Sequence, residues 1–333
     1  MTRYGVTIPF DHVALSEQRE WYAEAADLGY TDLWSSEAGG TDAFTPLALA
    51  AAWTPSLRLG CAIVPAFTRG PGLMAMSVAS MAEAAPGRFV FGIGTSSDVI
   101  VERWNSIPFD EPYKRTRDMV RFLRAALTGE KVDEQYDTFT VKGFRLGRSL
   151  DAATIPPIVV AALRPGMLRL AGREGDGAII NWLSAEDVRT VVPHVDAGRA
   201  ERGRDGSPEI VARIFVCPSE DADAVRAMGR FAIAAYLNVP VYAAFHEWLG
   251  RGDALGPMWD NWKAGDRKAA AASIPDEVVD DLIVHGPPEV CRAHVRRYLD
   301  NGVTTPALAI LPLSGRPEDA RQALRDLSPS ADS

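Results

Sequence analysis

The chain has 333 residues, 47% of them hydrophobic and 24% charged, a composition that excludes a disordered or fibrous protein. Its net charge of −9, from 35 basic and 44 acidic residues, disfavours nucleic acid and anionic membranes as partners, because both are bound through clustered lysine and arginine. We therefore expect a small-molecule ligand, with no nucleic-acid and no membrane partner.

The three cysteines give little sign of covalent or metal chemistry. Cys61, Cys217 and Cys291 lie far apart and form no CxxC pair, so neither a disulfide framework nor a metal site is predicted. The first residues lack an apolar leader, and no run approaches ~18 uninterrupted apolar residues. We expect a cytoplasmic protein.

Short apolar runs recur along the chain, and eight of them are predicted strands: 4–8, 31–35, 57–64, 88–94, 157–162, 177–181, 209–216 and 306–311. Helical patterns separate nearly all of them. In the first helix, Ser16 is the predicted N-cap, and Gly29 is expected to end the helix in the left-handed conformation. The runs are continuously apolar, which is typical of parallel strands buried on both faces.

Eight strand and helix units in one chain predict an α/β fold, a (β/α)8 TIM barrel, as a single domain over residues 1–327. The tail at 328–333 is expected to be disordered. Two insertions interrupt the pattern at about 95–156, with a helix near 110–127 and a hairpin-like stretch, and at about 236–285, which is largely helical. Both follow the C-terminal ends of strands, the active-site face of a barrel, so we expect them to wall or cover the pocket.

The common hydrolase and phosphate-binding motifs do not occur in this sequence: it has no HExxH, no GxSxG and no P-loop. Unusual segments follow four successive strands instead: LWSSE at 33–37, GCAIVPAFTR at 60–69, GIGTSSD at 92–98 and AALRPGM at 161–167. Because the C-terminal ends of barrel strands meet at one rim, we expect these segments to lie together.

In order and spacing, these segments resemble the luciferase-like monooxygenase superfamily and, within it, the branch that uses the deazaflavin coenzyme F420. The resemblance covers almost the whole chain and extends to PYKRTRDMVRFLRAALTGEKV and IPPIVVAALRPGMLRLAGREGDGAIINW. It implies a homodimeric TIM-barrel enzyme that transfers a hydride between F420 and a small organic substrate. Two alternatives stay open: an FMN-dependent monooxygenase of the same superfamily, which uses reduced flavin and O2, and a non-catalytic barrel that binds the deazaflavin.

The resemblance also implies which residues hold the coenzyme. A non-prolyl cis peptide bond at Ala62–Ile63 would place a strand bulge against the ring, and Thr95, Ser96 and Asp98 would contact the polar edge of the ring and the ribityl chain. The phosphate would bind at the next loop, where a helix begins and backbone N–H groups can hold an anion. That loop comprises Ala161, Ala162, Leu163, Arg164, Pro165, Gly166 and Met167. An ordinary strand and ordinary turns are the alternative interpretation of both segments.

Ser36 and Glu37 stand where the resemblance places the reactive face of the ring, at a position where many relatives carry a histidine. We predict that Glu37 gives or takes the proton that accompanies hydride transfer, the alternative being a solvated loop glutamate. Phe67 and Trp182 are predicted to line the substrate pocket. The acidic coenzyme also requires local positive charge, which we expect from Arg69, Arg103 and Arg164.

Overall fold

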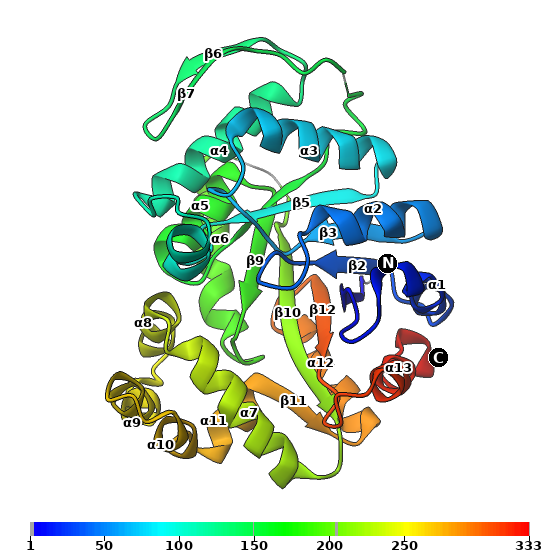
Figure 1. Cartoon of the computed structure of the whole chain (residues 1–333), viewed down its shortest axis with the longest axis vertical. Coiled ribbons are helices and arrows are strands. Elements are labelled where there is room, and N and C mark those ends of the chain that lie inside the picture. Colours follow the sequence, from blue (N-terminus) through cyan, green and yellow to red (C-terminus); the bar gives the residue numbers. More distant parts are fainter. Residues whose placement is uncertain (1–2, 149, 204–205, 333) are drawn as a thin grey trace.

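The computed structural model describes residues 3–148, 150–203 and 206–332. Over these residues, eight parallel strands close into a barrel with helices around it, which confirms the predicted fold (Figure 1). The barrel closes because β10 pairs with both β9 and β12, and β12 pairs with β1. In barrel order the strands are β1 (Gly5–Ile8), β2 (Asp32–Ser35), β3 (Arg58–Cys61), β5 (Phe89–Gly94), β8 (Ile158–Ala161), β9 (Gly177–Asn181), β10 (Glu209–Pro218) and β12 (Thr305–Ile310).

The helices that follow the strands form the outer layer: α1 (Arg19–Asp27), α2 (Phe44–Trp53), α3 (Pro71–Ala84), α4 (Pro112–Ala126), α5 (Pro165–Glu174), α6 (Val188–Glu201), α12 (Pro288–Asp300) and α13 (Pro317–Asp326). Gly29 ends α1 with φ of 89°, as predicted. The predicted cap was wrong, because Ser16 lies in a short 3-10 helix, η1 (Leu15–Glu17). The chain turns there on Gln18, whose buried amide bonds to the backbone N–H and carbonyl of Phe10, each at 2.9 Å.

An apolar layer fills the middle of the barrel. It consists of Trp34, Val90, Val159, Ile179, Val211 and Ala307, all buried. The indole of Trp34 spans the interior only because the neighbouring strand carries glycine, since a β-carbon on Gly60 would lie 2.3 Å from the ring. This layer seals the barrel, so a ligand can enter only from one end.

Below that layer, an ion cluster closes the N-terminal end of the barrel. Its members lie on four strands, each two residues before a residue of the apolar layer or before Gly60: Asp32, Arg58, Glu209 and Thr305. Residues two apart on a strand share a face, so these side chains also point inward. Arg58 bonds to Asp32 and, through Nη1, to Glu209 at 3.0 Å; Thr305 Oγ1 donates to Glu209 at 2.8 Å. Burial alone would raise the pKa of Glu209, but its bonds to Arg58 lower that pKa below its ordinary value.

The first insertion contains α4 and an antiparallel hairpin, β6 (Val132–Gln135) and β7 (Thr140–Phe144), as the sequence predicted. The hairpin packs on the outer face of α4, where Phe122 meets Phe139 and Phe144 at ring distances of 6.2 and 5.6 Å. In Figure 1 it lies beyond α3 and α4, at the edge of the molecule. The structure thus corrects the prediction that this hairpin covers the pocket: its aromatic side chains bind it to the helix layer.

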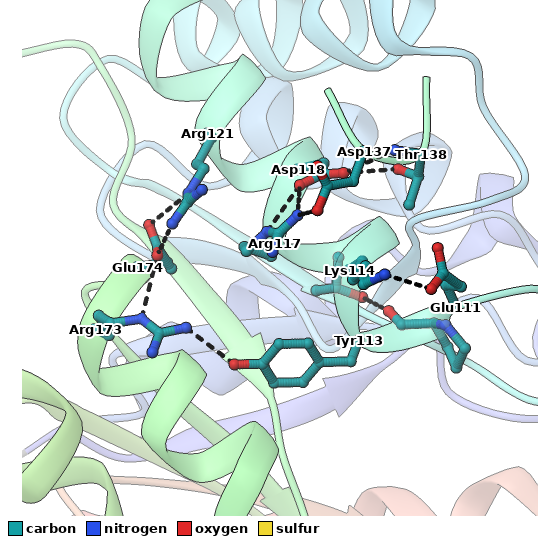
Figure 2. A network of polar contacts seen from close by, with 12 residues as sticks. Glu111, Tyr113, Lys114, Arg117, Asp118, Arg121, Asp137, Thr138, Arg173 and Glu174 are labelled. Carbon is teal, nitrogen blue, oxygen red and sulfur yellow. Dashed lines mark hydrogen bonds and ion pairs between the residues drawn. The ribbon is translucent and has the colours of Figure 1, made fainter. Parts of the chain in front are cut away.

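Charged residues of α4 form hydrogen bonds and ion pairs with the hairpin and with α5 (Figure 2). Buried Asp118 accepts hydrogen bonds from the N–H and hydroxyl of Thr138 in the hairpin turn, both at 3.0 Å. On the opposite side, Arg121 of α4 bonds to Glu174 at the end of α5, at 2.7 Å. This contact holds α5 against α4. Since α5 begins at the predicted phosphate loop, the contact also helps to position that loop.

The second insertion is helical, as predicted, and comprises α8 (Pro240–Trp248), α9 (Gly252–Lys263), α10 (Arg267–Ala272) and α11 (Asp276–Leu282). The helix α7 (Ala222–Leu237), which follows β10, leads into it. These helices form their own core and lie at the opposite end of the molecule from the hairpin (Figure 1). Of the described residues, none belongs to a helix that is both long and apolar enough to span a membrane.

The sequence missed one strand, β11 (Ile283–Gly286), which pairs with the end of β10 through Val216 and Val284. It follows α11 directly, so no turn residues mark the start of a new strand in the sequence. Ser328, placed by the sequence in a disordered tail, is buried, and its hydroxyl donates to the carbonyl of Leu28 at 2.8 Å. The structure differs from the prediction here because this hydroxyl gives the carbonyl at the C-cap of α1 a hydrogen-bond partner. Ser333, also in the predicted tail, lies outside the described residues.

We predict that Glu209→Gln lowers the free energy of unfolding at pH 7 by about 2–4 kcal/mol, because Arg58 would keep its charge without a full partner. Since the pKa of Glu209 is lowered in the folded state, its contribution is present above the unfolded-state pKa of about 4.3 and disappears as the pH falls through the folded-state value. Urea unfolding at pH 7 and at several lower pH values measures both effects.

Glu186→Gln is the matched control, because Glu186 pairs with Arg297 at the surface, where both side chains are 52% exposed. The control should change stability by less than about 1 kcal/mol. Equal losses for the two variants would contradict a structural role for the buried cluster.

Candidate functional site

The four segments predicted to share a rim do lie together at the C-terminal end of the barrel. The Glu37 N–H donates to the carbonyl of Ile63 at 3.2 Å, and the Ala66 N–H donates to that of Gly94 at 2.9 Å. The rim continues to the next segment, because a β-carbon on Gly94 would lie 2.8 Å from that of Ala161. Residues from β2, β3, β5 and β8 therefore form one continuous surface.

A bulge interrupts the third predicted strand, and the expected cis peptide bond at Ala62–Ile63 is present. Gly60 pairs with Val90, and Val64 pairs with Ile93. Between these two pairs the chain advances four residues on the bulged side but only three on β5. One extra residue thus lies between β3 and β4 (Val64–Pro65). It directs Ala62 and Ile63 toward the barrel interior, where both are partly exposed and contact the apolar layer.

Glycine on the neighbouring strand makes room for this bulge. A β-carbon on Gly92 would lie only 1.9 Å from the carbonyl oxygen of Cys61, the residue that precedes the bulge. The alternating glycines of β5, at 92 and 94, are therefore a steric requirement of the site.

Some polar side chains of the loop that follows β5 already form hydrogen bonds or ion pairs with nearby residues. Ser96 has a left-handed conformation with φ of 63°, and Thr95 Oγ1 donates to its carbonyl at 3.2 Å. Asp98 pairs with Arg103 at 3.1 Å, both in or beside a π-helical turn, η2 (Val99–Trp104). Thr95, Ser96 and Asp98 remain partly exposed at the rim, so they are accessible to a ligand.

The predicted phosphate loop leads into the start of α5. Arg164 is the N-cap residue, and the first backbone bond of the helix runs from the Leu168 N–H to the Arg164 carbonyl at 3.0 Å. The N–H groups of Gly166 and Met167 precede that bond, so the helix supplies no partner for them. Together with the positive end of the helix dipole and the exposed Arg164, they form a set of donors suited to an anion.

Glu37 is held by four hydrogen bonds. Arg69 Nη1 lies 2.8 Å from both carboxylate oxygens, while Thr68 Oγ1 and the Ala43 N–H donate to them at 3.2 Å. The guanidinium of Arg69 also stacks on Phe44, 4.9 Å from the ring centre. Glu37 therefore joins the loop after β2 to the loop after β4.

The two residues predicted to line the substrate pocket are buried in packing. Phe67 contacts Phe109 at a ring distance of 5.2 Å, and the guanidinium of Arg115 lies over its ring. Trp182 stacks on Phe215 at 4.0 Å, within the core of the second insertion. Nearby aromatic rings occupy their faces, and neither residue lines the cavity that opens beside β1 at the rim.

A cavity of about 340 Å3 opens at the rim beside β1, β2, β10 and β12. Its walls include Ile8, Phe10, Ala309, Ile310 and Leu311, which are apolar, and Ser36 of the loop after β2. None of the described residues of either insertion lines this cavity. Tyr242 of the second insertion approaches the rim elsewhere, where its hydroxyl lies 3.5 Å from the side-chain nitrogen of Asn181 at the end of β9.

Apart from Ser36, sequence reasoning missed the polar side chains of the cavity, of which Thr7, Thr41 and Arg213 are the least exposed. Thr7 Oγ1, Thr41 Oγ1 and Arg213 Nε are buried without a hydrogen-bond partner among the described residues. A signal for Arg213 does exist, since an arginine interrupts the apolar strand EIVARIFVCP at a position that shares its face with Val211.

Of the arginines expected to attract an acidic coenzyme, two are already paired, Arg69 with Glu37 and Arg103 with Asp98. Arg164 has no ion-pair partner among the residues that the structure describes, and it is exposed at the start of α5. It is therefore the arginine that remains available to a ligand at the phosphate loop.

Comparisons with known proteins agree with this architecture. A family model described as luciferase-like monooxygenase matches residues 2–305. The chain is 27% identical over 292 residues to 5,10-methylenetetrahydromethanopterin reductase of Methanolobus tindarius, covering 85% of this chain and 87% of that protein. The structure of the coenzyme F420-dependent tetrahydromethanopterin reductase from Methanopyrus kandleri matches with a TM-score of 0.81 at 19% identity, over 98% of this chain and 97% of the other.

A further solved structure, an F420-dependent secondary alcohol dehydrogenase in complex with an F420–acetone adduct, has a TM-score of 0.78 at 15% identity. It covers 99% of this chain and 98% of its own. At these identities the two solved structures bear on the fold alone.

We predict that Gly92→Ala destabilises the protein by about 3 kcal/mol or more, because the new methyl group would overlap the Cys61 carbonyl and force the bulge to move. Gly256→Ala in α9 is the matched control, since a β-carbon there meets nothing within 4 Å. The control should be neutral or stabilising by up to about 1 kcal/mol. Thermal unfolding of both variants tests this, and a stable Gly92→Ala would contradict the steric argument.

Proposed function

Because the chain belongs to the luciferase-like monooxygenase family, we propose that it is an oxidoreductase that transfers a hydride between coenzyme F420 and a small organic substrate. The observation that carries the proposal is the shared rim, where the bulge at Ala62–Ile63, the polar loop at 95–98 and the start of α5 form one surface beside a cavity. A relative from Mycobacterium tuberculosis, 27% identical over 321 residues, is named a putative coenzyme F420-dependent oxidoreductase, which supports this cofactor.

The residues present fit such a coenzyme. The free N–H groups at the start of α5, with Arg164, match the acceptor oxygens of a phosphate. The bulge at Ala62 and Ile63 offers a flat apolar contact for a ring, and Thr95, Ser96 and Asp98 offer polar contacts beside it. When bound, F420 would supply a carbon centre that exchanges a hydride, an electron pair, with the substrate.

The protein's own contribution is positioning and exclusion of water. The cavity beside Ser36 has a volume within the range of small-molecule sites, ~300–1,000 Å3, and its apolar walls separate a bound substrate from solvent. The ion pair between Glu37 and Arg69 holds the loop after β2, which borders this space, against the loop after β4. We assign Glu37 as a positioning residue, since three donors already make four hydrogen bonds to its carboxylate.

Binding of oxidised F420 to the purified protein, followed by its fluorescence, tests the proposal. We expect Arg164→Ala to raise the Kd for F420 about tenfold, because the phosphate loses one charge-assisted contact. Arg169→Ala, which removes an exposed arginine further along α5, should leave the Kd within about twofold.

Two outcomes would overturn the proposal. Tight FMN binding without F420 binding would identify the flavin branch of the family instead. Tight F420 binding with no consumption of reduced F420 across a panel of ketones, imines and activated alkenes would identify a carrier barrel.

Glu37→Gln separates positioning from proton transfer. We expect the variant to bind F420 normally and to lower kcat about tenfold at every pH, since Gln holds Arg69 without the ion pair and the loops lose their exact spacing. Steady-state pH profiles are the measurement. The disappearance of one limb of the kcat profile would show instead that Glu37 transfers a proton, as the sequence predicted.

A further inference from the structure

Two arginines point into the barrel, and only one of them has an acidic partner. Arg58, below the apolar layer, bonds to Asp32 and Glu209. Arg213, above that layer, lies two residues after Val211 on the same face of β10. No carboxylate of the described residues lies within 4.0 Å of its guanidinium, and its aromatic contact is Phe215, 5.0 Å from the ring centre.

This imbalance is unfavourable. A partly buried cation without a counter-ion loses hydration, and each buried polar atom without a partner destabilises the fold. Thr7 Oγ1 and Thr41 Oγ1 line the same cavity and are unpartnered too. Three elements, β1, the loop after β2 and β10, thus direct unpaired polar groups into one space.

The charges at the exposed part of the cavity do not neutralise Arg213. Asp11 and His12 line the cavity but are exposed to solvent, and Arg316, which also lines it, pairs with Asp319 at 2.9 Å. The guanidinium and two hydroxyls together can satisfy the oxygens of one carboxylate. The surrounding walls, among them Ile8, Ala309 and Leu311, suit a short apolar body.

We propose that Arg213, with Thr7 and Thr41, binds the carboxylate of the substrate, so that the enzyme acts on a small organic acid. This inference rests on the proposed function, in that it takes the cavity as the substrate half of the site. It also separates the two anion sites, because no residue of β8 or of the loop that leads from it into α5 lines the cavity, and β8 lies two strands from β10 and four from β1 in the barrel order.

The test uses propionate as the probe, with propionamide as its neutral isostere, and saturation-transfer NMR on the protein without coenzyme at constant ionic strength. We expect propionate to bind and propionamide to bind at least about tenfold more weakly, as loss of a charge-assisted contact requires. Equal binding of the two probes, or binding of neither, would overturn the proposal.

Arg213→Met supplies the decisive variant, and Arg267→Gln the control, because Arg267 also stacks on an aromatic ring, Trp262, but lies on α10 outside the cavity. We expect Arg213→Met to lose propionate binding while its Tm rises by about 2 °C, since an unpaired cation is removed. A fall in Tm with propionate binding retained would overturn the proposal by assigning Arg213 to the fold. Arg267→Gln should bind propionate as the unaltered protein does.

A second arm identifies the source of the anion. With saturating F420 present, propionate should still bind, because no residue of the phosphate loop lines the cavity. Displacement of propionate by F420 would assign the site to an acidic group of the coenzyme and overturn the proposal. If F420 fails to bind at all, the proposed function fails, while propionate binding to the protein alone still decides the role of Arg213.

Discussion

The apolar layer around Trp34 is the constraint on which the site depends. An eight-stranded barrel encloses a space that side chains must fill, and here Trp34 fills much of it because Gly60 leaves room on the next strand. The layer divides the interior into a closed lower part and an open mouth. Polar groups below it can be satisfied only by each other, and polar groups above it can be satisfied by a ligand.

The two inward arginines show the consequence of this division. Arg58 stands among Asp32, Glu209 and Thr305, and the cluster stabilises the closed end of the barrel. Arg213 stands among threonine hydroxyls and an aromatic ring, with its Nε unpartnered. The same residue type therefore serves stability on one side of Trp34 and recognition on the other, and the unpaired arginine is the less stable arrangement.

Much of the fold follows from the pattern of apolar runs, because parallel strands buried on both faces must be continuously apolar. All eight predicted strands are present, and the cis bond at Ala62–Ile63, expected from family resemblance, is there too. The pattern failed where the chain is not periodic. β11 is too short and follows α11 without a turn, and the cap of α1 depends on a buried amide, Gln18, whose partner Phe10 lies eight residues away.

For the site, the sequence alone determined which segments end the strands, and hence that residues 36–37, 62–63, 95–98 and 161–167 meet at one rim, since parallel strands bring their C-terminal ends together. The tertiary structure alone decided which side chains remain free. Glu37 is occupied by Arg69, Phe67 and Trp182 are covered by aromatic rings, and Arg213 has no acidic partner among the described residues. The reason is physical: hydrogen bonds and ion pairs form between groups distant in sequence, so their satisfaction is a property of the packed barrel.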